Sequence, residues 1–142
     1  MLIGRVYVDG ASHGNPGPAG IGIVILNSEG RVLREHREFI GVHLTNNQAE
    51  YMAIIRALDL CSSIFSSGVL HVFSDSELLI RQLNGIYKVR SLNLKSLFIE
   101  VKRREKLFTT VHYHHVSREH NKKANELANK AVEEGLKGLK LT

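Results

Sequence analysis

The chain has 142 residues, which is about the length of one domain. Its composition, 43% hydrophobic and 23% charged, excludes disorder, collagen and coiled coil as the main architecture. The formal net charge of +5 favours a polyanionic partner, with nucleic acid as the first candidate. A single cysteine, Cys61, excludes an intramolecular disulfide and a cysteine-based zinc cluster, and it fits a reducing compartment.

No apolar stretch approaches the ~18 residues of a membrane span. The start of the chain runs directly into a strand-like pattern and lacks the basic-then-apolar layout of a signal peptide. We therefore expect a cytoplasmic protein that does not act at a membrane. No interface is evident in the pattern, so a monomer is the default expectation.

Hydrophobic periodicity predicts three strands in the first third of the chain, over residues 3–9, 21–26 and 31–40. The glycine- and proline-rich segment 14–20 is a loop between the first two strands. The segment 27–30 has the sequence Asn-Ser-Glu-Gly, which is typical of a hairpin turn. Three strands linked by such short connections are expected to be antiparallel.

The period changes to that of helices after Thr45. We expect helices over 48–61, 76–83, 92–108 and 121–134, and strands over 69–74 and 109–116. The later strands follow helices, so they add to the sheet in parallel through right-handed crossovers. The predicted fold class is α/β, a mixed five-stranded sheet flanked by helices. Residues 1–134 form a single domain in this prediction, and residues 135–142 form a C-terminal tail.

Two aspartates stand at the ends of predicted strands, Asp9 after the first and Asp75 after the fourth. Aspartate is depleted within strands, and in open α/β sheets ligands bind at the carboxyl ends of the strands. Each aspartate taken alone is explained as the cap of a turn or a helix. The two together, at equivalent ends of neighbouring strands, favour a functional site.

Glu50 falls in the first turn of the first predicted helix and has a structural explanation of its own. With Asn47 as the N-cap, the spacing Asn47-x-x-Glu50 resembles a capping box. Three carboxylates from separate elements nevertheless point to divalent cations, because Mg²⁺ and Mn²⁺ prefer oxygen ligands. Two such ions about 3.5–4 Å apart activate a water and stabilise the leaving oxygen of a phosphodiester. A basic protein with this site predicts phosphoryl transfer on nucleic acid.

Four segments of the chain carry a resemblance to a known family. They are Tyr7-Val-Asp-Gly-Ala-Ser-His-Gly-Asn-Pro-Gly-Pro18, Thr45-Asn-Asn-Gln-Ala-Glu50, Ser74-Asp-Ser76 and His120-Asn-Lys-Lys-Ala-Asn-Glu-Leu-Ala-Asn129. In this order and spacing they resemble type 1 ribonuclease H over nearly the whole chain, to about Glu134. The resemblance implies a ribonuclease H-like sheet with strand order 3-2-1-4-5. It also implies endonucleolytic hydrolysis of the RNA strand of RNA–DNA hybrids.

By the same resemblance, the reaction uses two Mg²⁺ ions, with Mn²⁺ as a substitute, and leaves 5′-phosphate and 3′-hydroxyl ends. Asp9 would be shared by both ions, and Glu50 and Asp75 would complete the site on the leaving-group side. The family's fourth carboxylate, an aspartate, falls at Asn125, which is nearly isosteric but neutral. We therefore expect weak binding of the ion that activates the water, and low activity of this chain.

The resemblance also assigns substrate-binding positions. Those that track the minor groove of the hybrid, where RNA 2′-hydroxyls are read, are Gly10, Ala11, Asn15, Asn46 and Glu77. Thr45 and Asn47 match positions that hold a phosphate of the DNA strand. Glu77 stands where some members of the family carry glutamine.

The resemblance also implies a residue that assists product release, because some members of the family use a histidine for this in the loop before the last helix. In this chain that loop offers two candidates, Arg118 and His120. Its position in the loop favours Arg118. The nearby run His112-Tyr-His-His115 is interpreted as histidines on a sheet surface, because no cysteine or third ligand at standard spacing supports a zinc site.

Asn125 leaves several readings open. A single-atom isosteric change in an otherwise intact motif favours an engineered Asp-to-Asn replacement in a ribonuclease H. The alternative is a natural chain that is a weak enzyme or a non-catalytic RNA–DNA hybrid-binding protein. Another nuclease of this broad fold, such as a DNA junction nuclease or an integrase, is a third reading. Asn15 and the segment 45–47 oppose it, because they suit the reading of 2′-hydroxyls.

Overall fold

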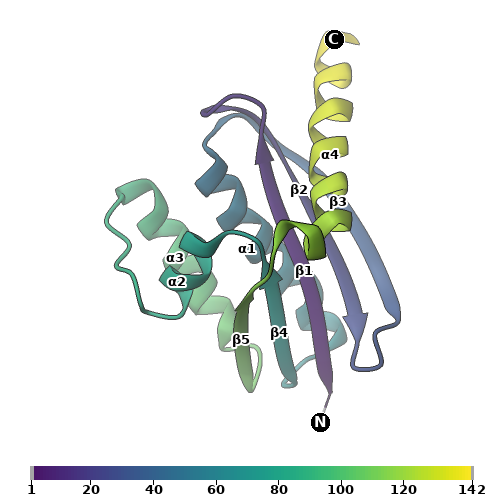
Figure 1. The fold of residues 1–142 in the computed structure, drawn as a ribbon, viewed down its shortest axis with the longest axis vertical. Coiled ribbons are helices and arrows are strands. Elements are labelled where there is room, and N and C mark those ends of the chain that lie inside the picture. Colours follow the sequence, from purple (N-terminus) through teal and green to yellow (C-terminus); the bar gives the residue numbers. More distant parts are fainter. Residues whose placement is uncertain (1, 142) are drawn as a thin grey trace.

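Five strands form one mixed sheet in the computed structural model, which describes residues 2–141 (Figure 1). The strands are β1 (Ile3–Ser12), β2 (Gly17–Asn27), β3 (Val32–Leu44), β4 (Val69–Ser74) and β5 (Thr110–His115). Their spatial order is β3-β2-β1-β4-β5. The pairs β1–β2 and β2–β3 are antiparallel, whereas β4 pairs in parallel with both β1 and β5. The predicted fold class and strand order are confirmed.

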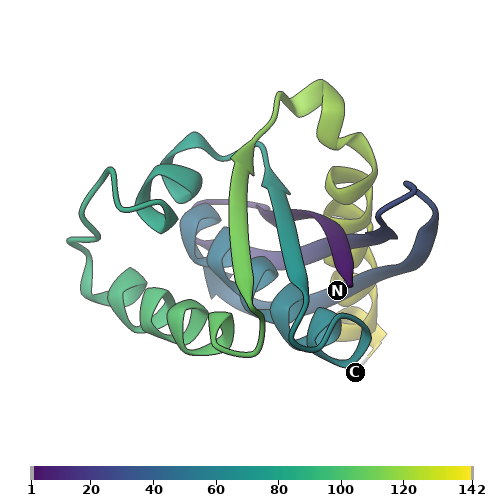
Figure 2. The same ribbon diagram turned by 90° about the horizontal axis from the view of Figure 1, so that it is seen from below.

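The helices cover the two faces of the sheet unequally. They are α1 (Asn46–Ile64), α2 (Glu77–Leu83), α3 (Leu92–Glu105) and α4 (Lys122–Leu141), with a 3-10 turn η1 (Arg118–Asn121) before α4. The first three lie on one face, and α4 lies on the other, where it packs on β1, β2 and β3. No helix of the described residues covers the α4 side of β4 and β5 (Figure 2). None of the described helices is long and apolar enough to cross a membrane.

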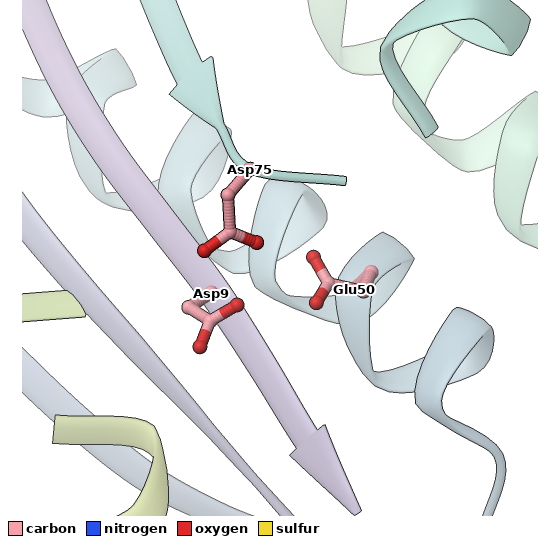
Figure 3. A group of neighbouring side chains, drawn as sticks. All are labelled: Asp9, Glu50 and Asp75. Carbon is pink, nitrogen blue, oxygen red and sulfur yellow. The ribbon is translucent and has the colours of Figure 1, made fainter. Parts of the chain in front are cut away.

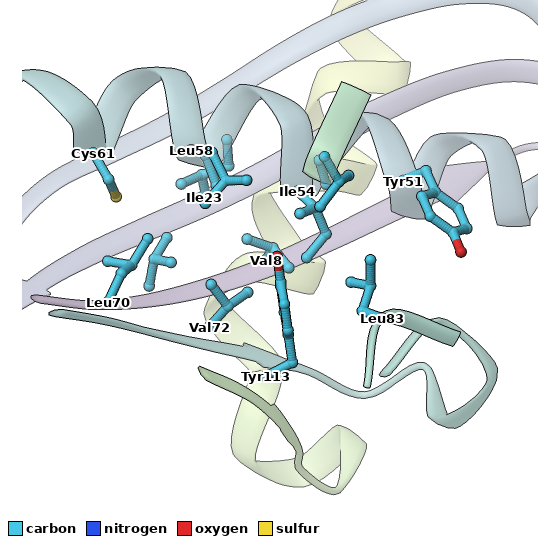
Figure 4. Close-up of a cluster of buried hydrophobic side chains, with 14 of the residues drawn as sticks. Val8, Ile23, Tyr51, Ile54, Leu58, Cys61, Leu70, Val72, Leu83 and Tyr113 are labelled. Carbon is cyan, nitrogen blue, oxygen red and sulfur yellow. The ribbon is translucent and has the colours of Figure 1, made fainter. Parts of the chain in front are cut away.

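The core fills the layer between α1 and the sheet (Figure 4). Val8 and Val72 come from the central strands, and Ile54 and Leu58 come from the facing side of α1; all four side chains are fully buried. Burial of one such aliphatic side chain stabilises the fold by about 1.5–3 kcal/mol. This layer holds α1 against β1, and Glu50 lies near the N-terminal end of α1, at the start of its second turn.

The start of α1 differs from the expectation. Its N-cap is Thr45 rather than Asn47: Thr45 Oγ1 accepts from the Gln48 amide, and Gln48 Oε1 accepts from the Thr45 amide. These two reciprocal hydrogen bonds form a capping box in which Gln48 is the N3 residue of the helix. The capping-box explanation of Glu50 is therefore wrong, and the carboxylate of Glu50 is not used to cap the helix.

The end of α4 also differs from the expectation. The helix does not stop at Glu134 but continues to Leu141, so the separate tail expected over 135–142 is wrong for residues 135–141; Thr142 lies outside the described residues. Gly135 resembles a glycine that ends a helix. Here it instead lets α4 lie close to β3, because a Cβ at this position would lie 2.2 Å from the Phe39 ring. Arg37 on β3 also pairs with Glu134 at 2.8 Å.

Two glycines provide a matched test of the packing of α4 on the sheet: Gly22 of β2, which α4 contacts, and Gly138 of α4 itself. A Cβ on Gly22 of β2 would lie 2.1 Å from the carbonyl oxygen of Ala124, a backbone atom that cannot rotate away. We expect Gly22→Ala to lower the free energy of unfolding by about 1–3 kcal/mol in urea denaturation. A Cβ on Gly138 meets no atom of the described residues within 4 Å, so Gly138→Ala is expected to raise the free energy of unfolding by up to about 1 kcal/mol. Equal effects of the two substitutions would contradict this account of the contact.

Candidate active site

Three carboxylates converge beside the central strands (Figure 3). Asp9 comes from β1, Glu50 from α1 and Asp75 from the residue directly after β4. One oxygen of each lies within 4.8 Å of the others. Parallel pairing of β1 with β4 sets Tyr7 opposite Phe73, so Asp9 and Asp75 are level across the two strands. Asp9 does not end its strand as expected, because β1 runs on to Ser12.

Gly10 brings the third carboxylate to the pair. A Cβ at this position would lie 2.3 Å from the carbonyl carbon of Ala49, so only glycine lets the first turn of α1 approach β1 this closely. The backbone of Gly10 also hydrogen-bonds to Glu50. The close approach of the first turn of α1 therefore brings Glu50, the next residue along the helix, against β1, where its carboxylate faces Asp9.

Burial and the repulsion between neighbouring carboxylates raise the pKa of two carboxyl groups of this site. Asp9 is 2% exposed, and burial together with the charge of Asp75 raises its pKa from 3.8 to about 6. Burial, and next the charge of Asp9, raises the pKa of Glu50 well above its ordinary value. The buried Glu50 Oε2 has no hydrogen-bond partner within the described part of the chain. Converging oxygen ligands with an unpaired buried acceptor fit a hard divalent cation, which would relieve the repulsion.

The raised pKa of Asp9 predicts how metal-free stability depends on pH. The native state binds this proton more tightly than the unfolded state, so the stabilisation is complete below pH 3.8 and is lost as the pH rises through about 6. The difference between the two pKa values corresponds to on the order of 3 kcal/mol. In urea denaturation with EDTA, we expect Asp9→Asn to be more stable than the parent at pH 8. At pH 4 the two proteins should be nearly equal; a constant difference across this range would contradict the assignment.

Asn125 occupies the fourth position of the site, on α4. Its Nδ2 donates to Asp9 Oδ2 at 2.8 Å, and this hydrogen bond lowers the pKa of Asp9. Asn129, one turn later, donates through Nδ2 to the Asn125 carbonyl oxygen at 3.0 Å. Asn125 therefore presents an amide donor to the central carboxylate, where an aspartate would present a charged acceptor.

The three carboxylates lie in an open polar cavity between β1, the start of α1 and α4. The predicted site residues that line this cavity are Asp9, Gly10, Ala11, Asn46, Asn47, Glu50, Asp75, Arg118 and Asn125. The charge of Arg118 lowers the pKa of Asp9. The structure thus brings most of the predicted residues to one surface hollow, although they come from four separate parts of the sequence.

Four predicted residues lie outside the lining of this cavity. Thr45 caps α1, and Asn15 Oδ1 accepts from the Asn46 amide at 3.0 Å, so both support the cavity wall. Glu77 pairs with Arg81 on α2 at 2.8 Å. The His120 ring hydrogen-bonds to Ser117 at 2.7 Å and lines a different, smaller pocket with Tyr7 and Lys123. Arg118, rather than His120, is therefore the basic loop residue at the carboxylates.

The cavity also contains residues to which sequence reasoning gave no role. They are Ser12, His13, Ser76 and Asn129. The His13 ring lies 3.0 Å from Asn129 Oδ1, which joins the loop after β1 to α4. Both residues stand inside segments that carried the family resemblance, but only the fold shows that these segments meet.

The comparisons with known proteins agree with this geometry. Residues 7–131 match the family described as reverse transcriptase-like. Ribonuclease HI of Halobacterium salinarum is 37% identical over 133 residues, which cover 92% of this chain and 66% of that protein. The chain belongs to the type 1 ribonuclease H family. It spans 66% of the Halobacterium protein and 35% of bifunctional protein Rv2228c of Mycobacterium tuberculosis, to which it is 36% identical.

Solved structures of ribonucleases H superpose closely on this chain. The N-terminal ribonuclease H domain of Rv2228c from Mycobacterium tuberculosis, solved as a fusion with maltose-binding protein, has a TM-score of 0.91 at 33% identity. That match covers 98% of this chain and 99% of the other. LC11-RNase H1, solved in complex with RNA/DNA hybrid, has a TM-score of 0.89 at 39% identity and covers 94% and 99% of the two chains.

Proposed function

We propose that this chain hydrolyses the RNA strand of RNA–DNA hybrids as an endonuclease, leaving 5′-phosphate and 3′-hydroxyl ends. The observation that carries the proposal is the convergence of Asp9, Glu50 and Asp75 in a polar cavity of a ribonuclease H fold. We propose two Mg²⁺ ions as the cofactor, with Mn²⁺ as a substitute. The chain is further proposed to act as a monomer in the cytoplasm.

The proposed roles of the site residues are to hold the metal ions and to bind the released phosphate. Asp9, Glu50, Asp75 and Asn125 would hold the ions, which supply an activated water and stabilise the leaving oxygen. Neighbouring carboxylates repel one another and raise the pKa of Asp9 and of Glu50, so cation binding is favoured by the repulsion it removes. Arg118, which lines the cavity, is proposed to hold the released phosphate, and His120 is a weaker candidate for this role.

Recognition of the hybrid is proposed to use the polar wall of the cavity. Gly10 and Ala11 of β1 line the cavity, while Asn46 begins α1 beside them and its amide donates to Asn15 Oδ1. Small residues and amides suit a minor groove, where RNA 2′-hydroxyls both donate and accept hydrogen bonds. Thr45 and Asn47 are proposed to hold a phosphate of the DNA strand, and Glu77 to lie farther along the groove.

Cleavage of defined duplexes tests this proposal. A hybrid labelled on the RNA strand, a DNA duplex and an RNA duplex of the same sequence are incubated with the chain in Mg²⁺ and in Mn²⁺. We expect slow cleavage of the hybrid RNA strand, with 5′-phosphate products and no cleavage of the DNA duplex. Cleavage of the DNA duplex at a comparable rate would refute the proposed substrate.

A second candidate function is binding of hybrids without cleavage, and Asn125 is the observation that favours it. Its amide donates to Asp9 and brings no negative charge to the site. Binding of hybrid in a gel-shift assay, with no product in either metal and none after Asn125→Asp, would support this second candidate over the first.

A further inference from the structure

The uncovered side of β4 and β5 carries a row of stacked rings that the proposed reaction does not use. His71 on β4 lies level with His112 on β5, and their ring centroids are 5.0 Å apart. His114, two residues farther along β5, stacks on His71 at 5.1 Å and on Phe73 at 4.9 Å. Phe73 stacks in turn on Tyr7 of β1. The parallel register of the strands therefore gathers three imidazoles on one open face.

Two of these imidazoles present nitrogens to each other at close range. His71 Nδ1 and His114 Nε2 are 2.9 Å apart. Metal–imidazole bonds are about 2.0–2.1 Å long, so an ion bound to both nitrogens at this separation would have an N–metal–N angle of about 90°. That angle belongs to square-planar and octahedral coordination, whereas tetrahedral zinc sites require a wider one.

We propose that His71 and His114 form a two-imidazole site for a borderline divalent ion, Ni²⁺ or Cu²⁺, on the open face of β4 and β5, with water in the remaining positions. Imidazole nitrogens suit these ions, whereas Mg²⁺ prefers the oxygens of the carboxylate site. The site would join the two neighbouring strands through a metal. It is independent of the proposed ribonuclease activity, because none of its residues lines the catalytic cavity.

The protonation of the pair is compatible with metal binding. Burial lowers the pKa of both rings, and the neighbouring histidines lower it further, so both are neutral at pH 7. The hydrogen bond between them needs one N–H, on either His71 Nδ1 or His114 Nε2. When the ion binds, that hydrogen moves to the other nitrogen of the same ring. Each ring then donates one lone pair, and no proton is lost from the pair.

The residues around His71 and His114 both support the site and limit its affinity for a metal ion. Phe73 stacks against His114, and His112 stacks against His71, so both ligand rings are supported on one side. The positive charge of Arg5 lowers the pKa of His71 and also opposes a bound cation. We therefore expect a site that depends on both imidazoles, since one ring alone would not hold the ion against this charge.

Titration with metal ions tests the site directly. Ni²⁺ is followed by calorimetry and Cu²⁺ by electron paramagnetic resonance, both in excess Mg²⁺ to occupy the carboxylates. We expect one ion per chain and a Cu²⁺ spectrum with two nitrogen ligands. His71→Phe and His114→Phe keep a stacked ring but remove the donor atom, and each should weaken binding by about tenfold or more.

His115→Phe is the matched control, because His115 is the next residue of β5 and alternation directs its side chain to the other face. It should bind Ni²⁺ as tightly as the parent. All three variants should cleave or bind hybrid like the parent, which separates this proposal from the proposed function. Absence of binding by the parent, or equal binding by His71→Phe, would show that the pair is only a hydrogen bond between β4 and β5.

Discussion

The Asn125→Asp variant is expected to cleave the RNA strand of a hybrid at least about a hundredfold faster than the parent chain in Mg²⁺. The substitution turns an amide that donates to Asp9 at 2.8 Å into a fourth carboxylate. A metal ion contributes several kcal/mol of charge stabilisation in such reactions. A gain of about 3 kcal/mol in transition-state stabilisation corresponds to roughly a hundredfold in rate. The measurement is single-turnover cleavage of a labelled hybrid by the two proteins side by side.

A change in stability accompanies this gain and provides a second readout. In the metal-free protein the new carboxylate would face Asp9, whose pKa is already raised by burial and by Asp75. We expect Asn125→Asp to lower the melting temperature in EDTA and to restore it in Mg²⁺ by more than the parent gains. Asn129→Asp, one helical turn away, is the matched control and should not accelerate cleavage. An unchanged rate in Asn125→Asp would remove Asn125 as the reason for low activity.

Replacement of Asp9 by asparagine is expected to abolish cleavage. In the Asn125→Asp background, we expect Asp9→Asn to reduce the single-turnover rate by about a thousandfold or more. Asp9 lies between Glu50, Asp75 and residue 125, so its loss weakens every cation position of the cluster at once. A loss of about 4 kcal/mol of transition-state stabilisation gives a factor of this size.

Binding of the hybrid distinguishes this catalytic effect from misfolding. Asp9→Asn keeps the shape of the side chain and removes a buried charge, so the variant should fold and bind hybrid at least as well as its parent in a gel-shift assay. Glu134→Gln, which alters an exposed ion pair with Arg37 outside the cavity, is the control and should keep most of the cleavage rate. Cleavage by Asp9→Asn at the rate of its parent would contradict the proposed metal site.

Local patterns in the sequence determined the elements and several of the site residues. Alternating and β-branched runs predicted all five strands, because a strand buried on one or both faces needs these residues whatever surrounds it. Short hairpins and right-handed crossovers predicted which strands are antiparallel and which are parallel. The order of the strands in the sheet came from the family resemblance. The motif around Asp9, Glu50 and Asp75 identified the acidic cluster through the family resemblance.

The end of α4 depended on a contact that no local pattern contains. Gly135 resembles the end of a helix, yet α4 continues because this glycine lets it lie against Phe39 of β3. The start of α1 is a different case, because two overlapping local patterns compete there. Thr45-x-x-Gln48 has the spacing of a capping box, as Asn47-x-x-Glu50 does, and the hydrogen bonds of Gln48 select Thr45 as the N-cap.

By itself, the sequence determined the fold class, the family and the identity of the three carboxylates, because composition, periodicity and spacing are local properties. The tertiary structure alone decided that Arg118 and not His120 reaches the cavity, and that Asn125 donates to Asp9. It also decided that His71 meets His114 across two strands more than forty residues apart in the chain. Such contacts depend on strand register and helix packing, and those are set by the burial of the whole core rather than by any one segment.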